Sequence, residues 1–228
     1  RMPRDQAATG PAAGDAPGDS PVTVPLRDRT LVPIIVFGVS AVLIATGQFA
    51  SFTYIRPYLE GAAGIEPSWV ATLLLVYGLA GIVGVVLAGA LADRMPRAAL
   101  VGTVALFVGS FLLLAVAPLV VAPLAAGPTV TALVIAAMAV WGVAMGALFP
   151  LLQSTLMRVA SERTRTLASA GIVVFFNVGI TIGPWAGGAL LSASPTAPLI
   201  VSALLLAVAG ILVVVGLVLA RERLRATT

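Results

Sequence analysis

One arginine of this 228-residue chain stands apart from the others. Arg56 lies in the stretch YIRPYLE, at the end of a long apolar run and directly before Pro57. Its guanidinium group could extend along its aliphatic stem to the lipid headgroups and pair with Glu60. It could instead turn inward and line the outer mouth of a cavity. The flanking Tyr54 and Tyr58, and the proline, which interrupts a regular helix, favour the cavity-lining role.

Two amide side chains lie within apolar runs. An amide in hydrocarbon needs a hydrogen-bond partner, and both a substrate and a neighbouring helix could supply it. Aromatic residues nearby could stack on a lipophilic substrate, or could pack in the core or against lipid. The candidate residues for a substrate cavity are Gln48, Phe49, Phe52, Tyr54, Arg56, Trp141 and Asn177.

The chain contains neither histidine nor cysteine. Disulfides, thiolate metal sites and redox pairs are thereby excluded, as is most hydrolase chemistry that relies on a serine–histidine pair. We therefore expect no enzyme activity, no cofactor and no metal site. A proton-coupled transporter needs a titratable group at membrane depth, usually a carboxylate. A proton site is expected outside this chain, because only the edges of the apolar runs carry acids, namely Glu60, Glu66, Asp93 and Glu162.

Six apolar segments must position these residues. Of all residues 60% are hydrophobic and only 10% are charged, whereas a soluble domain carries about 25% charged residues. Each segment reaches the length of about 20 residues that crosses a bilayer as a helix, and each is apolar on all faces. The sequence therefore predicts an all-α membrane protein. Its predicted spans are residues 31–55, 69–91, 98–117, 129–152, 167–191 and 199–220.

Every basic residue is an arginine, and most arginines mark one side of the membrane. They lie in both terminal tails and in the loops after the second and fourth spans. With six spans these regions face one compartment, and positively charged loops stay in the cytoplasm. We predict a multi-pass protein of the cell membrane with both termini cytoplasmic. The net charge of +4 is not gathered on a basic, aromatic-rich surface, so nucleic acid is not an expected partner.

The segments outside the spans are polar or short. Residues 1–29 lack the apolar content to fold and are predicted to be a flexible cytoplasmic linker. The six-span domain then covers residues 30–221, and residues 222–228 form a cytoplasmic tail. Because the first residue is not Met, we expect the chain to be part of something longer. The proline-rich connection at residues 118–128 is expected to be a packed turn, and the connection at residues 192–198 is very short.

The spans follow a rhythm that occurs twice. The first and fourth spans carry the amides Gln48 and Gln153, the second and fifth are rich in glycine, and the third and sixth are nearly uniform Leu, Val and Ala. This order fits two three-helix repeats, which transporters commonly use in inverted orientation.

The fifth span contains a glycine ridge. Gly179, Gly183 and Gly187 recur every four residues, so a neighbouring helix can approach closely along this line. Pro184 removes a backbone hydrogen bond and is expected to bend the helix.

The loop after the second span reads GALADRMPRAAL. Asp93 follows an apolar helix and precedes Arg94 and Arg97. These charges could be ordinary anchors on the cytoplasmic side. They could also form an ion-pair latch, or Asp93 could cap a neighbouring helix N-terminus, which is worth about 0.3–1 kcal/mol.

The loop also resembles the G-x-L-A-D-R-x-G-R motif of the major facilitator superfamily. Pro96 replaces the glycine of that motif and Ala98 replaces a usual basic residue. The matching positions are Gly89, Leu91, Ala92, Asp93, Arg94 and Arg97.

Three further stretches carry the resemblance, which covers the chain from about Arg27 to its end. FTYIRPYLE and FFNVGITIG resemble the seventh and eleventh spans of drug:proton antiporters of the arabinose-efflux-permease type. GITIGPWAGG resembles the antiporter pattern G-x3-G-P-x2-G-G of the family, although Ala170 stands where the full pattern has an earlier glycine. The matching positions are Gly179, Gly183, Pro184, Gly187 and Gly188.

The resemblance implies the C-terminal half of a twelve-span transporter that works by alternating access. Its partners would be the lipid bilayer, a small-molecule substrate, and either an N-terminal six-span half or a second copy. The first span of each triple would line the cavity, the second would help form the interface between halves, and the third would face lipid. Proton-coupled efflux of a small, lipophilic molecule is the expected function. A non-transporting fragment and a half-size transporter acting as a homodimer remain alternatives.

Overall fold

The computed structural model describes residues 28, 30–118 and 127–225, and every regular element within them is a helix. Six helices are long and apolar enough to cross a membrane, which confirms the predicted fold class. They are α1 (Leu31–Phe52), α3 (Pro67–Arg94), α4 (Pro96–Val116), α5 (Gly127–Val159), α6 (Arg165–Leu191) and α7 (Ala197–Arg225). Two short helical segments, α2 (Ile55–Pro57) and η1 (Tyr58–Ala62), follow α1. Nearly all of the predicted linker and most of the predicted proline-rich turn lie outside the described residues.

The helix bounds differ from the predicted spans by up to seven residues, and two of the helix ends show why. α1 ends at Phe52 rather than at residue 55, because Tyr54 has a non-helical backbone (φ −112°, ψ 23°). α5 continues to Val159, well beyond the predicted end at residue 152. A hydropathy pattern ends at the first polar residues, whereas the backbone hydrogen bonds of a helix continue through them.

A proline also fixes the turn between α3 and α4. Met95 separates the two helices with φ −143° and ψ 57°. A residue before proline is pushed out of the helical region by the proline ring, and Pro96 is well suited to the first turn of the next helix. The DRMPR loop is therefore a break of a single residue between two spans.

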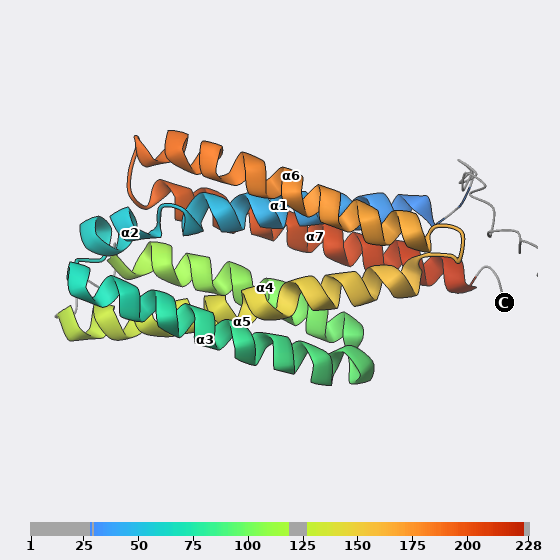
Figure 1. Cartoon of the computed structure of the whole chain (residues 1–228), viewed down its shortest axis with the longest axis horizontal. Helices are drawn as coiled ribbons and strands as arrows, with labels where there is room; N and C mark the ends of the chain where they lie inside the picture. Colours follow the sequence, from blue (N-terminus) through green and yellow to red (C-terminus); the bar gives the residue numbers. More distant parts are fainter. Residues whose placement is uncertain (1–27, 29, 119–126, 226–228) are drawn as a thin grey trace, which may run out of the picture.

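The packing of the helices repeats within the chain. α1 packs on α6 and α7, α5 packs in the same way on α3 and α4, and α4 packs on α7. Exchanging α1 with α5, α3 with α6 and α4 with α7 leaves these pairings unchanged. α1 begins at the end of the molecule where α7 ends, and α5 begins at the opposite end (Figure 1). The arrangement therefore fits the two inverted three-helix repeats predicted from the rhythm of the spans.

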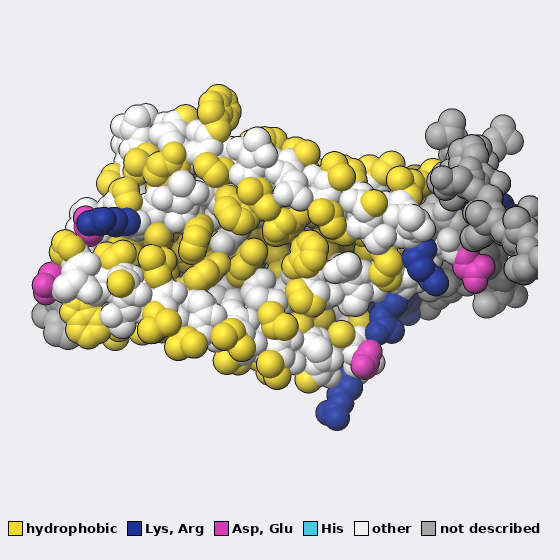
Figure 2. Space-filling model, in the orientation of Figure 1, with side chains coloured by type: hydrophobic (Ala, Val, Ile, Leu, Met, Phe, Trp, Pro, Cys, Tyr) yellow, Lys and Arg dark blue, Asp and Glu magenta, His cyan; other side chains and the backbone are white. Residues whose placement is uncertain are grey.

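Charge separates the two ends of the bundle. The start of α1, the α3–α4 turn, the α5–α6 loop and the end of α7 lie together at one end, and arginine side chains gather there (Figures 1 and 2). We call it the arginine-rich end; the arginines there whose side chains the structure describes are Arg94, Arg97, Arg158, Arg163, Arg165 and Arg221. The opposite end holds α2, η1 and the start of α3, with Arg56, Glu60 and Glu66. The surface between the ends is largely apolar (Figure 2).

The two closest helix crossings depend on glycine. At the α1–α6 crossing, a Cβ added to Gly179 or Gly183 would lie 2.5 Å from Val42 O or 2.8 Å from Thr46 O. Gly187 faces Ala50 O in the same way, one turn further on. At the equivalent α3–α5 crossing, the close contacts come from Gly84 on α3 and from Gly142 and Gly146 on α5. The predicted ridge is thus present, and it packs within this six-helix body.

Candidate functional site

Gln48 joins three helices in the interior of the bundle. Its side chain is only 2% exposed. Oε1 accepts a hydrogen bond from Trp141 Nε1 of α5 at 2.6 Å, and Nε2 donates to the hydroxyl of Tyr77 of α3 at 2.9 Å. Bonds to neighbouring helices therefore use both ends of the amide, one of the two alternatives that the sequence left open. Sequence reasoning missed Tyr77, although it is the only aromatic side chain with a hydroxyl in α3.

An aromatic cluster surrounds this amide. Trp141 is fully buried and lies 4.8 Å from Phe111, 5.1 Å from Tyr77 and 6.0 Å from Phe52, measured between ring centroids. Phe52 and Tyr77 are 5.2 Å apart and only partly buried. Tilted and edge-on rings at these distances attract one another beyond simple burial. The cluster holds α1, α3, α4 and α5 together and exposes the edges of only two rings.

Asn177 lies elsewhere, in a separate hollow between α5 and α6. Its amide nitrogen donates to Val173 O within its own helix at 2.8 Å, and its side chain is exposed. The hollow measures about 280 Å³ and is otherwise lined by Met145, Phe149, Val173 and Phe176. Phe149 and Phe176 meet edge to face, with centroids 5.3 Å apart. Asn177 is therefore a polar group in an apolar, aromatic hollow, with its amide oxygen available to accept a hydrogen bond.

The face that carries α3, α5 and α6 is shaped like a trough. Figure 2 shows it hollowed along the middle, between α6 on one side and α3 on the other, and lined by hydrophobic side chains. Charged side chains lie only at the two ends of this face. The surface can accept an apolar or aromatic molecule, and it offers few groups that would hold a charged one.

At the end of the bundle opposite the arginine-rich end, Arg56 forms an ion pair with Glu60. Nε lies 2.7 Å from Oε1, one helical turn apart, and the arginine side chain is 69% exposed. This is the pairing anticipated in the first of the two interpretations of Arg56. Tyr54, which was also expected to line a cavity, packs on the glycine-rich face of α6. A Cβ added to Gly188 would lie 2.6 Å from the hydroxyl oxygen of Tyr54.

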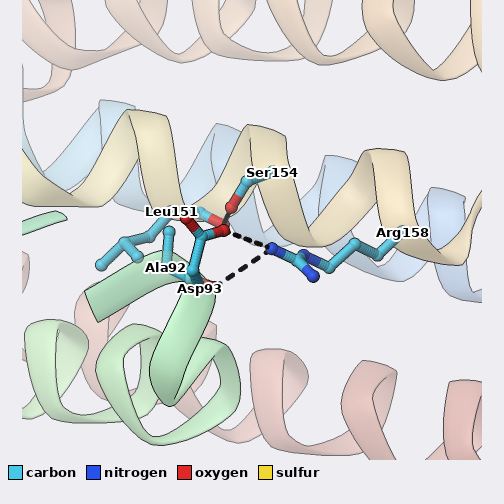
Figure 3. Close-up of polar contacts among 5 residues, drawn as sticks. All are labelled: Ala92, Asp93, Leu151, Ser154 and Arg158. Carbon is cyan, nitrogen blue, oxygen red and sulfur yellow. Dashed lines mark hydrogen bonds and ion pairs between the residues drawn. The ribbon is translucent and has the colours of Figure 1, made fainter. Parts of the chain in front are cut away.

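The charged loop between α3 and α4 is joined to α5. Arg158 Nη2 donates to Asp93 Oδ1 and to the backbone oxygen of Ala92, both at 3.2 Å (Figure 3). Asp93 therefore forms an ion pair, as in one of the alternatives for this loop, with a partner that the sequence did not suggest. It does not cap α4, which has no side-chain cap. Both side chains are largely exposed, and Gly89, Arg94 and Arg97 of the same motif lie in the open.

A second polar contact at this end joins the start of α1 to the α5–α6 loop. Asp28 accepts hydrogen bonds from the amide and hydroxyl of Thr30, at 2.9 and 2.8 Å, and from the hydroxyl of Ser161 at 2.8 Å. The hydrogen bond from the Thr30 amide is the main cause that lowers the pKa of the Asp28 carboxyl from its ordinary value, and the hydroxyls of Thr30 and Ser161 add to the effect. Sequence reasoning missed this contact because it assigned Asp28 to a flexible tail.

The described fold and its apolar trough define a polytopic α-helical membrane protein built from two inverted triples. The profile of the Major Facilitator Superfamily matches residues 33–227. The chain therefore belongs to this superfamily, as its loop and glycine motifs suggested. This is a family of transporters rather than of catalytic enzymes.

Several curated proteins are similar to the chain. The inner membrane transport protein YdhP of Escherichia coli (strain K12) is 34% identical over 154 residues, which cover 68% of this chain and 37% of that protein. The chloramphenicol efflux pump Rv0191 of Mycobacterium tuberculosis is 34% identical over 184 residues, covering 80% and 43%. The chloramphenicol resistance protein of Streptomyces lividans is 29% identical over 208 residues, covering 88% and 49%. The chain spans less than half of the length of each of these relatives.

Proposed function

We propose that this chain forms one half of a transporter that exports a small, lipophilic, aromatic molecule across the cell membrane. The observation that carries the proposal is the apolar trough of α3, α5 and α6, with an aromatic hollow that contains a single exposed amide, Asn177. Two relatives have names that refer to chloramphenicol, a neutral molecule with an aromatic ring and several hydrogen-bond acceptors and donors. A substrate of this class suits the trough, since it needs stacking surface and few polar contacts.

The other wall of the pathway is proposed to come from a second six-span body, either an N-terminal half or a second copy. Support comes from the uneven burial of the spans. α3 and α6 are the least buried of the six, and they expose large apolar side chains such as Val86 (68%) and Trp185 (78%). The helices α3 and α6 form the two borders of the trough (Figure 2). Alternating access would then consist of rocking the two bodies around it.

Proton coupling is proposed to depend on a carboxylate of that second body. The described spans of this chain carry acids only at their ends, where Glu60 and Asp93 are paired with arginines. The arginine-rich end is proposed to face the cytoplasm, because basic loops stay on that side. The chain alone, reconstituted in proteoliposomes, should then show no transport driven by a pH gradient; such transport would contradict this assignment.

The experiment that tests the pathway is drug efflux from cells that express the whole protein to which this chain belongs. Asn177→Ala removes the exposed amide from the hollow. Ser169→Ala is the matched control: Ser169 also lies on α6 and also bonds to its own helix, through Thr166 O at 3.0 Å, but it does not line the hollow.

Loss of one neutral hydrogen bond of about 0.5–1.5 kcal/mol corresponds to a change of about two- to tenfold in apparent affinity. We expect Asn177→Ala to raise the KM for chloramphenicol export by this factor, and Ser169→Ala to leave it unchanged. Equal effects of both substitutions, or no effect of either, would remove Asn177 from the pathway.

A further inference from the structure

A second cavity lies at the arginine-rich end, where α4, α5 and α7 meet. Its volume is about 620 Å³, which is within the range of about 300–1,000 Å³ that is common for ligand sites. It shares no lining residue with the aromatic hollow on the trough. Its polar lining comes from Arg97, Thr155 and Arg158, and its apolar lining includes Val159 and Leu217.

Thr155 is the first sign that this cavity has an occupant. The residue is 5% exposed, and its hydroxyl oxygen is buried without a hydrogen-bond partner among the described residues. Several other hydroxyls in the helices bond to the backbone of their own helix. Ser154, for example, donates to Leu151 O at 3.0 Å (Figure 3), the carbonyl four residues before Thr155. A buried hydroxyl without a partner is unfavourable, so its partner is expected from a molecule in the cavity.

The charges around the cavity indicate the chemistry of that molecule. Arg97 lies in the first turn of α4 and has no hydrogen bond or ion pair to any residue that the structure describes. Arg158 uses only Nη2 for Asp93 and Ala92, so Nη1 and Nε remain available. The positive end of the α4 dipole adds to these donors. Guanidinium groups and a helix N-terminus together are suited to phosphate oxygens.

An apolar groove continues from this cavity along the same two helices. It has a volume of about 590 Å³. Its lining residues, all of them Val, Ala, Leu, Ile or Gly, lie between positions 101 and 112 of α4 and between positions 207 and 215 of α7. The two sets of lining residues are separated by less than one turn on each helix. Gly109 forms part of its floor, where a Cβ would meet no atom within 4 Å.

From this combination we infer that the chain binds one anionic phospholipid at the seam of α4 and α7. The phosphate lies in the cavity, where Arg97 and Arg158 pair with its oxygens and Thr155 donates its hydroxyl. One acyl chain lies in the groove. The occupant is a lipid rather than a soluble phosphate ester, because the groove continues into the apolar depth of a helix that spans the bilayer. Near the cavity the two positive charges of Arg97 and Arg158 are balanced by one described carboxylate, that of Asp93, which pairs with Arg158. This excess of positive charge favours an acidic headgroup over a zwitterionic one.

Native mass spectrometry of the whole detergent-purified protein tests this site. The protein is titrated with phosphatidylglycerol or with phosphatidylcholine of the same acyl chains. We expect one phosphatidylglycerol to be retained with about tenfold higher affinity than phosphatidylcholine. Arg97→Gln and Thr155→Val should each weaken it by about tenfold, the loss expected for one charge-assisted hydrogen bond. Arg221→Gln, which removes an exposed arginine that does not line the cavity, should have no effect.

Gly109→Leu tests the groove separately from the headgroup site. The new side chain would occupy open space, so it should displace an acyl chain without unfolding the protein. It should weaken long-chain phosphatidylglycerol more than a dihexanoyl analogue. Equal binding of the two lipid classes, or equal effects of Arg97→Gln and Arg221→Gln, would overturn the inference. Displacement of the lipid by equimolar glycerol 3-phosphate would assign the site to a soluble phosphate instead.

Discussion

The α1–α6 crossing leads to a prediction whose magnitude follows from the geometry. A Cβ at position 183 would lie 2.8 Å from Thr46 O and 2.9 Å from Phe49 Cβ, whereas ordinary contact begins at 3.4 Å. Gly183→Ala must therefore push the helices about 0.6 Å apart, or distort one of them. Overpacking of this kind costs about 1–3 kcal/mol. Alanine recovers about 1 kcal/mol through its better helix propensity, so we expect a net loss of up to about 2 kcal/mol in the free energy of unfolding.

The matched control is Gly171→Ala, on the same helix. The nearest atom to its Cβ would be a ring carbon of Phe175 at 4.0 Å, so this change should be neutral or slightly stabilising. Unfolding of the purified protein by denaturing detergent, followed by the fluorescence of its tryptophans, measures both variants. Equal stability of the two would show that α1 and α6 are not in close contact along this ridge, and would refute the packing described above.

Three further predictions concern the polar contacts. Gln48→Leu should destabilise the protein by about 2–5 kcal/mol, because it leaves a buried indole N–H and a phenol hydroxyl without their partner; Gln48→Glu, which keeps an acceptor for the indole, should cost less in the same unfolding assay. Asp93→Asn should lower the free energy of unfolding by less than about 1 kcal/mol, because the pair with Arg158 is largely exposed. If Asp93→Arg or Arg158→Asp alone lowers the export rate, the double variant with both substitutions should restore it. The pKa of Asp28 is lowered in the folded protein, so its bonds, including that from Ser161, stabilise the fold above about pH 4 and are lost as the pH falls through the lowered value; Asp28→Asn should remove this acid-dependent part of the thermal unfolding curve, and an unchanged curve would mean that the contact does not form.

The architecture could be predicted from the sequence because its physical requirement is simple. A span must be apolar for about 20 residues, so the six helices, the arginine-rich end and the glycine ridge could all be read from residue types. Spacing alone could not give the partners. Nothing in the pattern indicates that Gln48 bonds to both Tyr77 and Trp141, since these contacts depend on how α1, α3 and α5 cross.

The candidate site was predicted only in part, for the same reason. Gln48, Phe52 and Trp141 were chosen for a cavity, yet the structure places the amide in a structural network and Trp141 fully in the core. Asn177 was chosen by the same rule and lies in the open hollow. Two amides in apolar spans are equivalent as residue types, and only the rotation of each helix about its axis separates them.

The central claim is that the trough of α3, α5 and α6 borders a water-filled transport pathway. Cysteine labelling in intact cells is its most direct test. The chain has no cysteine of its own, so single substitutions can be compared without background from it. Asn177→Cys in the aromatic hollow and Leu112→Cys in the α4–α7 groove lie on different surfaces of the same body. We predict that a polar maleimide labels the first and not the second, and that chloramphenicol slows the labelling. Labelling of Leu112→Cys but not of Asn177→Cys would place the trough against lipid and contradict the account.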